Sequence, residues 1–190
     1  MARFQIIPPS RPQQKRAVTM QRLRDAGYSV GAHGAVVLLG VRGYYLDTMG
    51  LAGVNDRKLY DDAMFLVSPR LHLAFNANTD PGAHRRGIAT LLPGIHPYKR
   101  GRHGISRGPG YPALRPATPG ERLLVWRDGM TGVYSGIAIN IHKGSRTSVS
   151  SEGCQTIWPG QYAEFIDAVY AEMIALNQIT IHYVLVEERK

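Results

Sequence analysis

Cys154 and His142 are the two side chains in this sequence whose types and spacing best suit covalent chemistry. Cys154 is the only cysteine of the 190 residues, and it directly follows Gly153. A thiol is mostly protonated at neutral pH, so a nucleophilic cysteine needs a base or a cation beside it. Histidine is the side chain best suited to accept that proton near pH 7. The pair therefore predicts a cysteine nucleophile, Cys154, with His142 as its base.

The backbone around this pair suits acyl transfer. Residues 136–142 alternate as a strand does, so His142 is expected at a strand end. The loop of residues 143–153 is long enough to bring Cys154 back to the same end of the sheet. Gly153 permits close approach of a substrate carbonyl, and the N–H groups of Gly153 and Cys154 are expected to bind an oxyanion.

The segment resembles the catalytic domain of the L,D-transpeptidases, the YkuD-like family of cysteine enzymes that act on peptidoglycan stem peptides. That family carries Ile-His-Gly at a strand end and then Ser-His-Gly-Cys or Ser-Lys-Gly-Cys. Here Ile141-His142-Lys143-Gly144 and Ser151-Glu152-Gly153-Cys154 stand in those places. The likeness is best over residues 136–157 and looser over 36–158. It implies a Cys154 acyl-enzyme that cleaves or exchanges a stem-peptide bond without a cofactor.

Further residues are expected to bind the oxyanion or the substrate. Four lie around the pair itself: Gly153, Ser151, Gly144 and Gln155. Ser150 and Ser151 are more typical of a turn in which the hydroxyls bond the backbone, with Ser151 as the one that could line the site. His103, in a long Gly- and Pro-rich stretch, is expected to lie near the substrate. A third group that orients His142 is expected among the backbone carbonyls of residues 144–148.

Departures from the family pattern mark the chain as a divergent relative. Lys143 separates the histidine from its glycine, and Glu152 replaces the usual His or Lys. Gln155-Thr156 replaces the usual Ile/Val-Arg after the cysteine. A Glu152 carboxylate turned toward the thiol would raise the pKa of Cys154.

The chain also resembles phage-encoded proteins with a Ser-x-Gly-Cys-Gln-Thr motif, which implies a lysin-like role.

The high net positive charge of the chain limits the classes of molecule that it is expected to bind. The net charge of +9 and pI of about 9.9 favour polyanions, such as nucleic acid, an anionic membrane surface or a bacterial wall. The basic residues are densest over 99–115, but no aromatic–basic strip or zinc-finger spacing indicates specific nucleic-acid binding. No signal peptide and no membrane span are expected. We expect synthesis in the cytoplasm and action in the periplasm or cell wall after release, or association with a virion. The oligomeric state is left open.

Two rival classes remain. One is a non-catalytic virion or wall-binding protein that keeps the fold. The other is a metal- or carboxylate-dependent wall hydrolase. His84, His96 and His103 match no metal motif, so no metal is expected. A glycosidase would need two carboxylates across a cleft. The candidates are Asp47, Asp56, Asp61, Asp62 and Asp80, of which the Asp61-Asp62 pair is expected at a surface turn.

The patterning predicts a mostly β (α+β) fold, a mixed barrel or sandwich with one main helix after the cysteine. An N-terminal arm and short helix (1–30) precede the catalytic domain (31–190). Helices are expected at 17–27 and 160–176. A hairpin is expected from 35–39 and 44–46, and an irregular loop over 99–120. The other expected strands are 63–67, 71–75, 88–92, 94–98, 123–126, 136–142 and 180–186.

Overall fold

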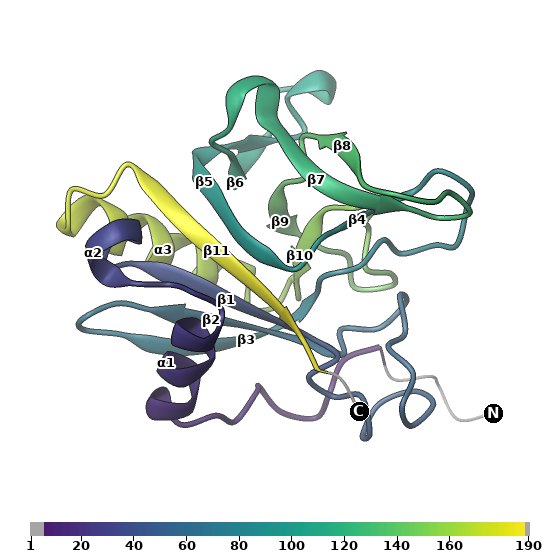
Figure 1. Cartoon of the computed structure of the whole chain (residues 1–190), viewed down its shortest axis with the longest axis horizontal. Helices are drawn as coiled ribbons and strands as arrows, with labels where there is room; N and C mark the ends of the chain where they lie inside the picture. Colours follow the sequence, from purple (N-terminus) through teal and green to yellow (C-terminus); the bar gives the residue numbers. More distant parts are fainter. Residues whose placement is uncertain (1–5, 189–190) are drawn as a thin grey trace.

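A closed barrel of mixed strand direction forms the centre of the structure (Figure 1). The computed structural model describes residues 6–188. Neighbouring strands around the barrel follow the order β1-β11-β5-β6-β9-β10-β3-β2, and β4-β7-β8 form a separate sheet. The expected mostly β, α+β architecture with one main helix after Cys154 is confirmed.

The strands are β1 (Val37–Arg42), β2 (Asp62–Val67), β3 (His72–Asn78), β4 (Ala89–Leu91), β5 (Gly94–His103), β6 (Tyr111–Pro116), β7 (Arg122–Arg127), β8 (Tyr134–Ile137), β9 (Ile141–Lys143), β10 (Gln155–Ile157) and β11 (Thr180–Glu187). The helices are α1 (Arg16–Asp25), α2 (Val30–His33) and α3 (Tyr162–Ala175), with 3-10 turns at Ile105–Arg107 and Pro119–Glu121.

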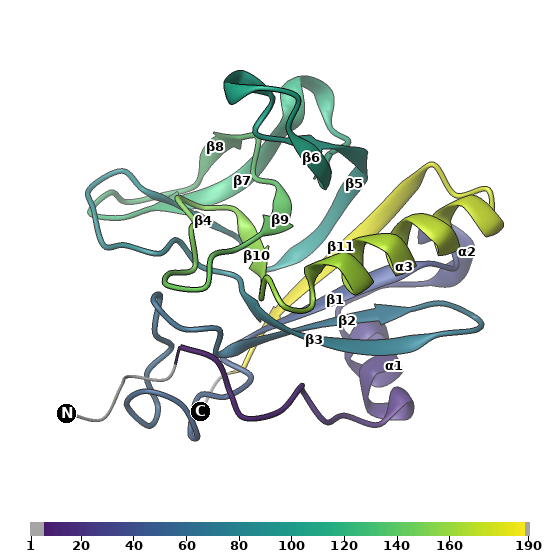
Figure 2. The same cartoon turned by 180° about the vertical axis from the view of Figure 1, so that it is seen from behind.

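Helices α3 and α1 cover opposite faces of the sheet made by β1, β2 and β11 (Figures 1 and 2). Phe165, Val169 and Met173 of α3 are buried in the larger apolar cluster. Leu23 of α1 packs with Phe65 in a second cluster on the other face. Both faces of these strands are therefore buried, which explains why their sequences are continuous apolar runs.

The N-terminal segment from residue 6 is extended and lies against the barrel (Figure 1). The Tyr60 amide donates to the Ile6 carbonyl at 2.8 Å. Arg11 Nη1 donates to Glu164 Oε1 of α3 at 2.9 Å. Residues 1–5 of the expected arm lie outside the described residues.

The expected hairpin of residues 35–39 with 44–46 is wrong. Residues 44–46 form a turn, and β1 pairs with β2 and in parallel with β11. Gly43 has φ +74°, and its amide donates to Asp62 Oδ1. The chain therefore leaves β1 at Gly43 instead of folding back beside it.

The expected irregular loop over 99–120 is also wrong. β5 continues to His103 and returns as β6, with Lys99 opposite Arg115 and His103 opposite Tyr111. A Cβ on Gly101 would lie 2.8 Å from the Arg115 side chain, so this glycine makes room for a cross-strand neighbour. Glycine and proline here mark close approaches and a turn within a hairpin.

The run 136–142 is two strands instead of one. Ala138 has φ +53°, and the chain passes there from β8 of the small sheet to β9 of the barrel. The left-handed conformation is uncommon for alanine. The change of sheet places His142 in the barrel wall beside the strand that follows Cys154.

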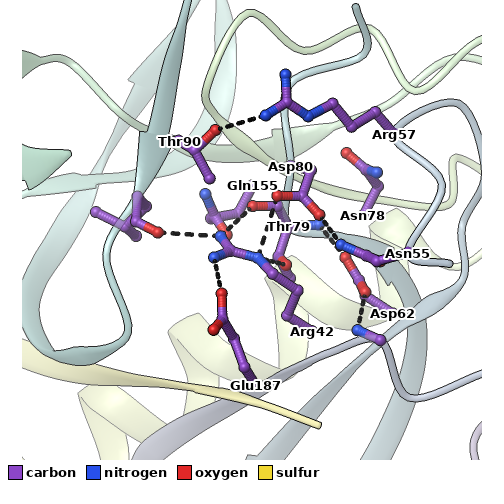
Figure 3. A network of polar contacts seen from close by, with 12 residues as sticks. Arg42, Asn55, Arg57, Asp62, Asn78, Thr79, Asp80, Thr90, Gln155 and Glu187 are labelled. Carbon is purple, nitrogen blue, oxygen red and sulfur yellow. Dashed lines mark hydrogen bonds and ion pairs between the residues drawn. The ribbon is translucent and has the colours of Figure 1, made fainter. Parts of the chain in front are cut away.

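A buried ionic network lies where β1, β3 and the loop after β3 meet (Figure 3). Arg42 is 5% exposed and pairs with Asp80 at 3.2 Å and Glu187 at 2.9 Å. Asp62 accepts from the amides of Gly43 and Thr79. The expectation of Asp61 and Asp62 at a surface turn is wrong, because both are fully buried.

This network predicts stability that depends on pH. Burial raises the pKa of Asp61 and of Asp62 above the ordinary carboxyl range, and their mutual proximity adds to the rise for Asp61. Both contribute stability at low pH that is lost as the pH rises through the raised pKa values. Asp61→Asn should therefore remove about 1–2 kcal/mol of the decline between pH 5 and pH 8. Urea unfolding at both pH values measures this, with exposed Asp25→Asn as control; equal slopes in all three proteins would contradict it.

Candidate active site

A cleft of about 720 Å³ opens beside the ends of β5, β6 and β9. Its lining brings together three residues that the sequence singled out, Cys154, His142 and His103. The lining also includes Tyr111, Arg115, Ala138, Asn140, Lys143, Ser150 and Glu152. A space of this size accommodates a peptide-sized ligand.

Pairing of β9 with β10 brings Cys154 and His142 to the cleft. The strands are parallel, with Gln155 opposite Ile141 and Thr156 opposite His142. Because side chains alternate along a strand, Ile141 and Gln155 face the buried interior, where both are fully covered. Cys154 and His142 are displaced from them by one residue and line the cleft.

His142 is held by acceptors on one ring nitrogen. Its Nδ1 lies 2.8 Å from the Lys143 carbonyl and 3.2 Å from the Tyr111 hydroxyl, which itself donates to that carbonyl. A carbonyl can only accept, so Nδ1 carries the proton and Nε2 keeps its lone pair. Within residues 6–188, Nε2 has no hydrogen-bond partner. The orienting carbonyl lies one residue before the expected loop 144–148.

Burial decides the charge state of His142. It lowers the pKa of His142 to about 4, assisted by the neighbouring His103 and opposed by the bond to Lys143. The imidazole is therefore neutral near pH 7 and can accept a proton.

Cys154 is half-buried, and its thiol lies 3.6 Å from the Ala138 carbonyl. Burial raises the pKa of Cys154 to about 11, although a backbone hydrogen bond from Asn140 and the charge of Arg115 lower it. Glu152 raises it further, as expected. The resting site thus holds a neutral thiol and a neutral imidazole, instead of a thiolate–imidazolium pair.

This charge state predicts how the thiol reacts with an alkylating agent. The iodoacetamide reaction draws on thiolate, so its rate should rise about tenfold per pH unit above pH 7 and level off only near pH 11. Mass spectrometry of the alkylated chain measures the rate, and glutathione serves as a reference thiol. A rate that is already level below pH 7 would show a preformed ion pair.

His103 ends β5 and stacks on His142. The ring centroids are 3.9 Å apart and the planes differ by 11°. Nδ1 of His103 lies 3.0 Å from the side-chain amide nitrogen of Asn140. Burial and Arg115 lower the pKa of His103, so this ring is also neutral near pH 7.

Gly153 and Ser151, expected to serve the oxyanion, form a turn instead. The Gly153 amide donates to Ser151 Oγ at 3.0 Å, and Ser151 Oγ donates to the Cys154 carbonyl at 2.6 Å. Gly153 has φ +133°, and a Cβ there would lie 2.8 Å from the Ala89 carbonyl. These residues fix the backbone at Cys154, but the Gly153 amide is already engaged.

Gln155 and Gly144 lie outside the lining of the cleft. The Gln155 side chain donates to the Gly153 carbonyl and accepts from the Tyr183 hydroxyl in the interior. Gly144 lies against the Tyr60 hydroxyl, which would collide with a Cβ. Both therefore have packing roles here.

Sequence reasoning missed Asn140 and Tyr111, and it named Arg115 only as part of the basic stretch 99–115. Asn140 lies two positions before His142 and so on the same face of the chain, which is a signal the sequence does contain. Tyr111 and Arg115 lie on β6, which was expected to be loop. Arg115 is held by Glu121, with Nε 2.8 Å from Oε1, so its guanidinium has a fixed position in the lining of the cleft.

The residues required for metal-dependent or carboxylate-dependent hydrolysis are not grouped in the described part of the chain. No group of three His, Cys, Asp or Glu within residues 6–188 could hold a metal ion. His96 is buried with Nε2 on the Leu92 carbonyl. Asp61, Asp62 and Asp80 are buried, and none of them lines the cleft. In the same part of the chain, no helix is long and apolar enough to cross a membrane.

Comparison with known proteins gives no relative. No protein-family model matches the chain, and neither the curated proteins nor the solved structures contain a significant match.

Proposed function

We propose that this protein is a cysteine acyltransferase or peptidase that acts on peptidoglycan stem peptides. The observation that supports this most strongly is the cleft itself. Two neighbouring parallel strands place the only thiol and a neutral imidazole in its lining, and the imidazole keeps Nε2 free.

In the proposed reaction, His142 Nε2 takes the proton of Cys154 while the sulfur attacks a peptide carbonyl. The carbonyl π electrons move to oxygen and form a tetrahedral oxyanion. When the oxyanion collapses, the C–N bond breaks and the leaving amine takes the proton from His142. A thioester on Cys154 remains. Water resolves it by hydrolysis, and an amine resolves it by forming a new peptide bond.

The charges of the cleft support a carboxylate-bearing peptide as substrate. Arg107, Arg115 and Lys143 line it, against one carboxylate, Glu152. Arg115 is already engaged, because Nε and Nη2 bind Glu121 and Nη1 donates to the Arg102 carbonyl. Arg107 and Lys143 are therefore the lining cations that support a substrate carboxylate. Stem peptides carry free carboxylates, and the wall around them is polyanionic, which suits the net charge of +9. A chain with this substrate acts after release to the wall, as a phage lysin does, or from a virion.

The decisive test incubates the wild type and Cys154→Ala with purified peptidoglycan fragments and identifies the products by mass. We expect shortened peptides for hydrolysis or exchanged peptides for transpeptidation, and neither product with Cys154→Ala. His84→Ala, which changes an exposed histidine outside the cleft, should keep the wild-type products. Fragments bound by the wild type but chemically unchanged would favour the non-catalytic wall-binding class. Product from a folded Cys154→Ala variant would refute the nucleophile.

A further inference from the structure

The stacked rings of His103 and His142 have opposite hydrogen-bond partners. Nδ1 of His142 meets the Lys143 carbonyl, which is an acceptor. Nδ1 of His103 meets the Asn140 side-chain amide nitrogen, which is a donor. A neutral imidazole has one N–H and one lone pair, so each partner fixes one tautomer.

The two tautomers give the two rings different capacities. His142 carries its proton on Nδ1 and keeps Nε2 as a base. His103 accepts at Nδ1 and therefore carries its proton on Nε2. Within the described residues neither Nε2 has a hydrogen-bond partner, and both rings line the cleft. The cleft thus holds two stacked rings with centroids 3.9 Å apart, of which His142 offers a proton acceptor and His103 a hydrogen-bond donor.

The oxyanion of the proposed reaction needs such a donor. Acyl-transfer sites usually offer two N–H groups to the oxyanion. Next to Cys154, the Gly153 amide is bound to Ser151 Oγ and the Gln155 amide to the Asn140 carbonyl at 2.9 Å. Of these three consecutive amides, that of Cys154 alone has no partner within residues 6–188. The backbone at Cys154 therefore supplies one hydrogen-bond donor for the oxyanion, and the second has to come from another group.

We infer that His103 is a second catalytic residue, whose Nε2–H joins the Cys154 amide in binding the oxyanion. This inference rests on the proposed function. His103 transfers no proton in this step: it stays neutral and donates a hydrogen bond as the oxygen gains charge. The proton of the thiol travels through His142 to the leaving group. Asn140 acts as a positioning residue, because its amide selects the donor tautomer of His103.

Two reagents separate this role from a structural one. Acylation by p-nitrophenyl acetate passes through an oxyanion and releases p-nitrophenolate, whereas alkylation by iodoacetamide forms none. His103→Phe keeps a ring to stack on His142 but has no donor. It should slow Cys154 acylation about 100-fold, the usual effect of losing one oxyanion donor, and change alkylation at the same pH by less than about threefold. His103→Gln, which carries an N–H donor, should recover part of the acylation rate.

The outcomes distinguish the two proposals. Equal burst acylation of wild type and Cys154→Ala would overturn the proposed function itself. The role of His103 alone would be overturned in either of two cases, provided that acylation depends on Cys154. In the first, His103→Phe leaves the acylation rate unchanged. In the second, it lowers the acylation and alkylation rates by the same factor.

The tautomers can be read without any activity. Two-bond ¹H–¹⁵N spectra of the histidine rings should show the Nδ1–H form for His142 and the Nε2–H form for His103. Asn140→Leu should remove the preference of His103. An Nδ1–H form for His103 would mean that Asn140 presents its oxygen to the ring, and it would overturn the inference.

Discussion

His142→Gln should lower the rate of Cys154 acylation at neutral pH by about 10²–10⁴-fold, the range that general-base catalysis usually contributes. The thiol, with its pKa raised to about 11, then has no acceptor for its proton and reacts only through the small thiolate fraction. The variant should therefore gain about tenfold in rate per pH unit toward alkaline pH. Release of p-nitrophenolate from p-nitrophenyl acetate measures it.

The pH dependence of the wild type provides a second, sharper signature. His142 with its pKa lowered to about 4 is still neutral at pH 5, so the acylation rate should be nearly level from pH 5 to pH 9. A histidine of ordinary pKa would have lost about thirtyfold at pH 5. His84→Gln should leave both the rate and the profile unchanged. A His142→Gln rate within threefold of the wild type would remove His142 from the mechanism.

Arg42→Met should lower the free energy of unfolding by about 3–5 kcal/mol, because it leaves buried carboxylates without their cation. Asp80 would lose its ion pair, and the pKa of Asp62, which Arg42 lowers, would rise further. The loss should be larger at pH 8 than at pH 5, since at acidic pH the stranded carboxyls take up protons in the folded state. Urea unfolding at the two pH values measures the difference.

Matched variants isolate the ion network from the loss of a long side chain. Arg24→Met removes an exposed arginine of α1 and should cost less than about 0.5 kcal/mol. The double variant Arg42→Met/Asp80→Asn should recover part of the loss, because it removes one of the stranded charges. If Arg24→Met and Arg42→Met cost the same, the network in Figure 3 would contribute nothing specific.

Sequence periodicity was sufficient to predict those helices and strands whose position depends only on which face is buried. The expected strands at 63–67 and 71–75 and the helix at 160–176 correspond to β2, β3 and α3. Their apolar spacing reflects the face that each element buries, and the same alternation placed His142 opposite the buried Ile141 face. The candidate pair was predicted because the chain has one thiol, which directed attention to the histidine that precedes it at a predicted strand end.

Sequence reasoning failed where a single backbone conformation or a single tertiary contact determines the course of the chain or the burial of a side chain. The residue types around Ala138 do not predict its φ of +53°, yet at this residue the chain passes from the small sheet into the barrel. The Gly and Pro residues of 99–120 were taken as loop, although Gly101 serves a cross-strand neighbour. Asp61 and Asp62 were expected at the surface, because the backbone amides that donate to their carboxyl groups, those of Asp56, Gly43 and Thr79, are brought to them only by the fold.

The place of β11 in the barrel has a consequence for biosynthesis. It is the last described strand, yet it lies between β1, which it joins in parallel, and β5. The barrel cannot close until residue 187 has left the ribosome, so β1 lacks this partner strand while residues 43–179 are translated. Such long-range pairing folds slowly and exposes strand edges meanwhile. Production of active protein should therefore respond strongly to chaperone supply and to growth temperature.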